Sequence, residues 1–285
     1  MDYIFIDENV RVLRGEAARL ALDHTNDACF YESGHGIRAV SEERWQIAQR
    51  AEMVHWFDRN RLAADDGNFL QLDGFDSFGV LSGSRVAHAA ELGCGPFTNL
   101  RLVGRVAHLE SCTLIDPSIQ RYIHHPNRYY DAQYLYVPPS ATWIPKLWRR
   151  APQLSRALCR HLGWTVPVRS LVNAGGESFR IGEPCDLLVV INVLEHCRDA
   201  RAVVENVLSA LGPRALVIVG DVFFDDEAVR DASCRCYDAA HPLRVTESVL
   251  SPLLDGADVL YDRSKPHAVE GYPGTVKRCV VARVA

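Results

Sequence analysis

Glu91-Leu-Gly-Cys-Gly-Pro-Phe-Thr98 is the stretch on which the predicted fold of this chain depends. It follows a short run at 86–90 that reads as a β-strand, so it predicts a sharp turn at a strand end. Gly93 and Gly95 can take positive φ and let the backbone approach a ligand with no Cβ in the way. Asp116 ends the next apolar run, close to the ~20-residue interval at which a β-α-β nucleotide fold offers a carboxylate to ribose hydroxyls.

A third landmark lies downstream of these two. Residues 186–191 are almost wholly apolar, as a central parallel strand should be, and they end in Asn192-Val-Leu-Glu-His196. In this order the three landmarks resemble the class I S-adenosylmethionine-dependent methyltransferases, from about residue 86 onward. The resemblance implies a doubly wound α/β fold, with a mostly parallel seven-stranded sheet and an antiparallel last strand.

The same resemblance implies a cofactor, S-adenosylmethionine, and a set of residues at the strand ends that bind it. These are Glu91, Gly93, Gly95, Asp116, Ser118, Glu177 and Asn192. Glu91 and the glycines would contact the amino-acid end of the donor, and Asp116 its ribose. Glu91 could instead brace the loop by accepting backbone hydrogen bonds, and Asp116 could be a capping residue before Pro117.

Methyl transfer requires in-line orientation of the acceptor, and it needs a base only where the nucleophile arrives protonated. Three residues at the same sheet edge are candidates for that catalytic role: His196, Asp221 and His241. Each has a structural alternative, such as a turn residue before Pro242 for His241. We expect an O- or N-methyltransferase acting on a polar small molecule, such as a sugar, an aminocyclitol or another specialised metabolite.

Two other functions are compatible with the same strand pattern. One is a nucleotide-cofactor-dependent oxidoreductase, which would use a related fold. The glycine turn of such enzymes has a third glycine, and this chain has Thr98 at that position, which counts against the alternative. A non-catalytic methyltransferase-fold subunit is the second alternative. The glycine turn and Asp116 are intact, which favours an enzyme.

The domain prediction has an N-terminal helical extension over 1–80 and a cofactor-binding domain over 81–285. Trp45 and Trp56 lie three helical turns apart, so they share a face, either in the core or as an aromatic wall over the site. An insertion at about 121–165, with a helix over 153–162, exceeds what a plain β-α-β unit needs. It would serve as a lid or as a contact in a homodimer.

Composition narrows the function classes. The net charge of −5 argues against a nucleic-acid partner, and no apolar run approaches the length of a membrane span. No signal peptide is evident, so we expect a cytoplasmic protein. The nine cysteines are expected to be mostly buried, reduced thiols. Cys234 and Cys236, with His241 nearby, make a poor zinc pattern, so no metal site is expected.

Overall fold

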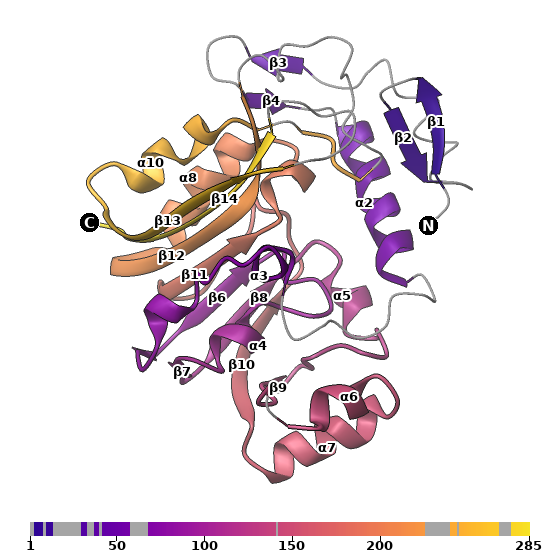
Figure 1. Cartoon of the computed structure of the whole chain (residues 1–285), viewed down its shortest axis with the longest axis vertical. Helices are drawn as coiled ribbons and strands as arrows, with labels where there is room; N and C mark the ends of the chain where they lie inside the picture. Colours follow the sequence, from indigo (N-terminus) through magenta and orange to yellow (C-terminus); the bar gives the residue numbers. More distant parts are fainter. Residues whose placement is uncertain are drawn as a thin grey trace.

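A computed structural model of the chain describes residues 3–7, 10–13, 30–32, 37–39, 42–57, 68–140, 142–225, 240–243, 245–267 and 275–285. Its centre is a twisted sheet of eight strands (Figure 1). Their order across the sheet is β13 (Asp258–Pro266), β14 (Thr275–Arg283), β12 (Leu211–Phe224), β11 (Cys185–Ile191), β6 (Ala89–Leu92), β8 (Cys112–Ile115), β10 (Thr165–Val172) and β9 (Tyr134–Tyr136).

The direction of the strands confirms the predicted fold class. Strands β10, β8, β6, β11 and β12 pair in parallel, and the last strand, β14, is antiparallel to both β12 and β13. The seven expected strands are therefore present. The eighth, β9, comes from the insertion and pairs antiparallel with the edge strand β10.

The core lies on both faces of this sheet, because the central strand β11 is apolar and buried from Leu187 to Ile191. Leu188 and Val190 belong to the cluster under helix α8 (Ala200–Ala210), whereas Leu187 and Val189 belong to the cluster on the opposite face. Helix α8 begins after Asp199, whose carboxylate accepts hydrogen bonds from two backbone N–H groups of the first turn.

The shorter elements connect this framework. They are α3 (Phe69–Leu72), η2 (Gly79–Leu81), α4 (Leu100–Val103), α5 (Ile119–Tyr122), η3 (Leu194–His196), η4 (Glu247–Leu250) and α10 (Ser251–Leu254), with a small parallel pair β5 (Arg85–Val86) and β7 (His108–Leu109).

The N-terminal extension is only partly helical. Helix α2 (Glu42–Phe57) is present, but it is preceded by two antiparallel hairpins, β1 (Tyr3–Asp7) with β2 (Val10–Leu13) and β3 (Phe30–Glu32) with β4 (Ile37–Ala39). Figure 1 shows α2 above the end of the sheet where β6, β8 and β11 finish. Its small residues Ala48 and Ala51 are fully buried there.

The insertion builds a small core of its own beside β9 and β10 (Figure 1). It contains helices α6 (Ile144–Trp148) and α7 (Pro152–His161), the second of which was predicted at 153–162. Tyr129 and Trp148 are buried and stack with ring centroids 4.1 Å apart. The excess of aromatic residues in this segment is therefore used largely for packing.

The described cysteines are all buried and unpaired with one another, as expected of small apolar side chains: Cys94, Cys112, Cys159, Cys185, Cys197 and Cys279. Cys234 and Cys236 lie outside the described residues. Within the part of the chain that the structure describes, no helix has both the length and the apolar character needed to cross a membrane.

Candidate functional site

A pocket of about 620 Å³, counted with its opening to solvent, lies at the carboxyl ends of β6, β8 and β11 beneath helix α2. This is the edge of an open α/β sheet at which ligands bind. Six of the residues predicted from sequence line it: Gly93, Gly95, Asp116, Glu177, Asn192 and His196. Their convergence brings together segments that are up to about a hundred residues apart in the chain.

The glycine turn has the geometry that its sequence predicted. Gly93 and Gly95 have φ of +68° and +49°, in the region that favours glycine. A Cβ on Gly93 would lie 2.5 Å from the Val193 side chain, so there is no room for a larger residue. The turn therefore presents bare backbone to the pocket.

Asp116 is held at the end of β8 by the turn itself. Its carboxylate accepts hydrogen bonds from the backbone N–H groups of Gly95 (3.1 Å) and Ser118 (2.7 Å). Burial raises the pKa of Asp116 to about 7, with further contributions from the negative charges of Glu52 and Glu91. Ser118 supplies a backbone contact to Asp116 and is not among the residues that line the pocket.

Glu91 lies behind the turn and is fully buried. Its carboxylate accepts hydrogen bonds from the Thr98 hydroxyl and from the backbone N–H groups of Asn99 (2.8 Å) and Leu100 (3.0 Å), at the start of α4. The geometry thus matches the bracing role that was the alternative for Glu91. A direct contact with a bound donor would require one of these hydrogen bonds to be replaced.

The position of Glu91 also bears on which cofactor fits. Dinucleotide-binding folds place a pyrophosphate on the free N–H groups at the start of the helix after the glycine turn. Here the N–H groups of Asn99 and Leu100 already donate hydrogen bonds to the carboxylate of Glu91. The helix that they begin, α4, has only four residues. The turn is therefore unsuited to a pyrophosphate.

One wall of the pocket comes from helix α2, through Trp45, Gln49, Glu52 and Trp56. These residues are spaced by four, three and four, so they form one stripe along the helix. The aromatic wall suggested by the two tryptophans is present. Gln49 and Glu52 were missed, although the same spacing could have identified them.

Glu177 and Asn192 line the pocket and also form polar contacts within the protein. Glu177 accepts hydrogen bonds from the backbone N–H groups of Arg198 (2.6 Å) and Asp199 (3.1 Å). Asn192 has φ of +60°, and its side-chain amide lies 3.2 Å from Nε2 of His196. Both residues are anchored before any ligand binds.

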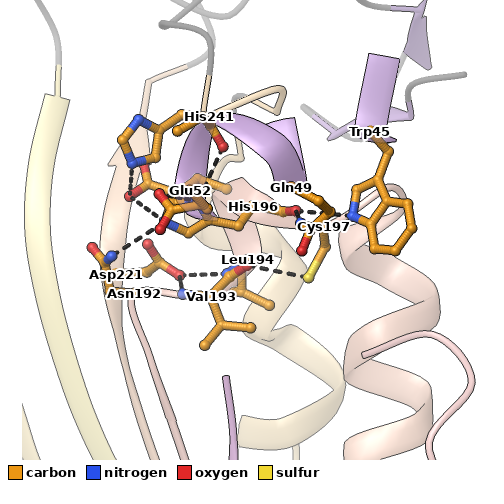
Figure 2. A network of polar contacts seen from close by, with 12 residues as sticks. Trp45, Gln49, Glu52, Asn192, Val193, Leu194, His196, Cys197, Asp221 and His241 are labelled. Carbon is orange, nitrogen blue, oxygen red and sulfur yellow. Dashed lines mark hydrogen bonds and ion pairs between the residues drawn. The ribbon is translucent and has the colours of Figure 1, made fainter. Parts of the chain in front are cut away.

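The three candidate catalytic residues belong to one network of polar contacts (Figure 2), but only one of them lines the pocket. His196 lines it, with Nδ1 3.0 Å from the carbonyl oxygen of Ala240 and 3.4 Å from Oε1 of Glu52. The ring of His241 lies beside that of His196, with centroids 4.3 Å apart, but His241 is not among the residues that line the pocket.

Asp221 is buried and lies below the loop that carries His196 (Figure 2). It accepts hydrogen bonds from the backbone N–H groups of Val193 (3.0 Å), Leu194 (2.7 Å) and Val222 (2.9 Å). Burial raises the pKa of Asp221 to about 6. These contacts favour a positioning role for Asp221 over contact with an acceptor.

Comparisons with known proteins identify the fold. No protein-family model and no curated protein sequence matches the chain. Among solved structures, SpnF, described as a [4+2]-cyclase, is similar with a TM-score of 0.50 and 14% identity, over 85% of this chain and 96% of SpnF. The N-methyltransferase NodS from Bradyrhizobium japonicum WM9 in complex with S-adenosylhomocysteine gives 0.48 and 20%, over 85% and 98%.

A third similar structure is the 1,6-didemethyltoxoflavin N1-methyltransferase of Burkholderia thailandensis, with S-adenosylhomocysteine bound. It gives a TM-score of 0.47 and 16% identity, over 90% of this chain and 99% of that one. The strand order and the similarity to SpnF show a doubly wound α/β fold with an antiparallel last strand, the fold that the resemblance to class I S-adenosylmethionine-dependent methyltransferases implied. A fold is shared by different reactions, so the activity has to be argued from the site.

Proposed function

We propose that this protein binds S-adenosylmethionine in the pocket under α2 and transfers its methyl group to a polar small molecule. One observation carries the proposal. The positive-φ glycine turn, the buried Asp116 and the post-strand residue Asn192 all meet in a single pocket at the carboxyl edge of the sheet. In a methyltransferase fold, this combination matches the amino-acid end, the ribose and the methionine portion of the donor.

The charge and shape of the pocket suit a cationic donor. Glu52, Asp116 and Glu177 place carboxylates around it, and among the residues that the structure describes no lysine or arginine lines it. Trp45 and Trp56 add aromatic faces, which attract a sulfonium or ammonium cation. S-adenosylmethionine carries both kinds of cation and supplies an activated methyl group when bound.

The chain's own residues would orient the acceptor and take up its proton. His196 reaches the pocket, and its contacts with Ala240 and Glu52 restrain its imidazole ring. The residues around it are polar and hydrogen-bonding, which favours an acceptor that offers a hydroxyl or an amine. We therefore propose an O- or N-methyltransferase of a sugar, an aminocyclitol or another hydroxylated or amino metabolite.

Calorimetric titration of the purified chain with S-adenosylmethionine and S-adenosylhomocysteine tests the cofactor. Asp116→Ala should weaken binding by at least about tenfold, because the ribose would lose a buried hydrogen-bond acceptor. Asp255→Ala, an exposed aspartate away from the pocket, is the matched control and should bind as the wild type does. Absence of binding by the folded wild type would overturn the proposal.

The acceptor is then sought by measuring S-adenosylhomocysteine formation over a panel of sugars, aminocyclitols and phenols. Turnover of any of them supports the proposed reaction. Binding of NADH with comparable affinity would instead favour the oxidoreductase alternative. Tight donor binding without turnover over a wide panel would favour a non-catalytic subunit with this fold.

A further inference from the structure

Four ionisable side chains from three separate segments converge at one end of the pocket. Glu52 comes from α2, Glu195 and His196 from η3, and His241 from the segment after β12. We call these four residues the His–Glu cluster; Figure 2 shows its two imidazole rings side by side. One donor atom from each of Glu52, His196 and His241 lies within 4.8 Å of the other two.

The oxygen–nitrogen distances within the cluster are longer than hydrogen bonds and closer to the distance between two ligand atoms bound to one metal ion. Oε1 of Glu195 lies 3.6 Å from Nε2 of His241 and 4.0 Å from Nε2 of His196. Glu52 approaches His196 on its other ring nitrogen, with Oε1 3.4 Å from Nδ1. Hydrogen bonds between such atoms are about 2.7–3.2 Å long. Two donors about 2.0–2.1 Å from a tetrahedral ion lie about 3.3 Å apart. The Glu195–His241 pair would need a shift of a few tenths of an ångström, and the other pairs a larger one.

The electrostatics of the cluster favour a cation. Two carboxylates stand next to two imidazoles, and the side chain of Glu195 is only 2% exposed. A bound cation would offset part of the cost of burying that carboxylate. Two imidazolium rings with centroids 4.3 Å apart would repel each other, so protonating both histidines is an unfavourable way to supply that charge.

The surroundings of His196 resemble those of a metal-binding imidazole. The carbonyl oxygen of Ala240 lies 3.0 Å from Nδ1, an arrangement that favours a proton on Nδ1 and leaves the lone pair on Nε2. Ligand histidines in proteins are held in this way by a carbonyl or carboxylate on the other ring nitrogen. The side-chain amide of Asn192 lies 3.2 Å from Nε2 of His196 and would have to move aside for an ion. Asp221 fixes the loop from below by binding the N–H groups of Val193 and Leu194.

We propose that the His–Glu cluster binds a divalent transition-metal ion, with His196 and His241 as nitrogen ligands and the carboxylates of Glu52 and Glu195 as oxygen ligands. Mixed imidazole and carboxylate donors select ions such as Zn²⁺, Mn²⁺ or Co²⁺ over Mg²⁺ and Ca²⁺. Glu52 and His196 line the pocket, so the ion lies at the pocket wall. The site rests on its own geometry and does not depend on methyl transfer. An ion bound through Nε2 of His196 would replace the role proposed above for that residue in taking up the acceptor's proton.

The test is metal binding by the chelator-stripped full chain, titrated with Co²⁺ and followed by its visible absorption, and with Zn²⁺ followed by calorimetry. The wild type should bind one equivalent and show the d–d bands of nitrogen and oxygen ligation. His241→Ala, His196→Gln and Glu52→Gln should each weaken binding at least about tenfold. His124→Ala removes an exposed imidazole outside the cluster and should leave the affinity unchanged.

Circular dichroism and thermal melting show whether each variant is folded, and Glu52→Gln keeps the test valid if a histidine variant fails. Two results would overturn the proposal. One is a folded His241→Ala or Glu52→Gln variant that binds the ions as tightly as the wild type. The other is an intense thiolate-to-cobalt charge-transfer band, which would place the ion on cysteines. Both metal-binding measurements are made without S-adenosylmethionine. Their outcome is therefore independent of whether the chain binds the donor.

Discussion

The indole Nε1 of Trp45 donates a hydrogen bond to the backbone carbonyl of His196 at 3.2 Å. This contact joins helix α2 to the loop after β11, and Gln49 donates to the same carbonyl at 3.4 Å. The two hydrogen bonds fix the wall of the pocket against the segment that carries His196. They tie a helix from the N-terminal extension to the sheet edge at which the proposed donor binds.

Trp45→Phe should weaken S-adenosylhomocysteine binding by about two- to tenfold. The substitution removes one hydrogen bond, whose net contribution is about 0.5–1.5 kcal/mol, and keeps an aromatic face. Calorimetry gives the affinity, and Trp143→Phe serves as the control because Trp143 is 61% exposed and lies in the insertion. Equal affinities in the two variants would contradict a role for α2 in the donor site.

Gly93→Ala should destabilise the protein more than Gly163→Ala does. Both glycines have φ near +70°, so each substitution carries about 1–2 kcal/mol of backbone strain. Only Gly93 adds a clash, since its Cβ would lie 2.5 Å from Val193, whereas nothing lies within 4 Å of a Cβ on Gly163. Urea unfolding measures the difference, and donor binding should be lost only in Gly93→Ala.

Glu91→Gln should lower the free energy of unfolding by about 2–3 kcal/mol. In the wild type both oxygens of the Glu91 carboxylate accept backbone N–H groups. A glutamine has one acceptor oxygen and one NH₂ group, so it would leave a buried N–H group without an acceptor. Glu110→Gln, at a partly exposed ion pair on the surface, should change it by less than about 1 kcal/mol. Similar unfolding curves for the two variants would show that Glu91 does not brace the turn.

The affinity for S-adenosylhomocysteine should rise with pH between 6 and 8. The pKa of Asp116 is raised to about 7, so at pH 6 about a tenth of the protein carries the charged carboxylate that accepts the ribose hydroxyls. The expected gain is up to about tenfold, and Asp116→Asn should remove it. If the variant shows the same slope as the wild type, another group is responsible, such as His196.

The same pKa shift has a consequence for stability. A carboxyl whose pKa rises from 3.8 to about 7 on folding binds a proton that the unfolded chain releases, so it makes the folded state less stable as pH rises through that interval. Asp116→Asn cannot ionise. Its melting temperature should therefore fall less between pH 4 and 7 than that of the wild type, as measured by calorimetry across that range.

Asp221→Asn distinguishes a positioning residue from a base. One oxygen of Asp221 accepts the N–H groups of Val193 and Leu194, and the other accepts that of Val222. An asparagine has a single acceptor oxygen, so one of these two sets of N–H groups loses its partner. Stability should fall by about 1–3 kcal/mol, and Co²⁺ binding at the His–Glu cluster should weaken. A base would behave differently. Turnover would be lost while stability and metal affinity stayed those of the wild type.

The fold could be predicted from local patterns because each of its signals lies within a short stretch. The apolar runs at β8 and β11 became buried strands and the glycine pair took positive φ, as expected. Strand burial and positive φ depend on neighbouring residues, as does the capping of α8 by Asp199. The same signals located the carboxyl edge of the sheet. They therefore also found most of the residues that line the pocket.

What the tertiary structure decided is which distant side chains meet there. Glu52 reaches His196 across 144 positions, and His241 reaches the same ring across 45, because α2 and the segment after β12 both pack on the loop after β11. No periodicity connects such residues, so the His–Glu cluster could not be predicted from their spacing. For Glu91 the sequence left ligand contact and bracing of the loop both open, and the packing around the turn favours bracing. Local patterns specify the strands, turns and caps of this chain, whereas packing across the sheet edge sets which charges face one another in its pocket.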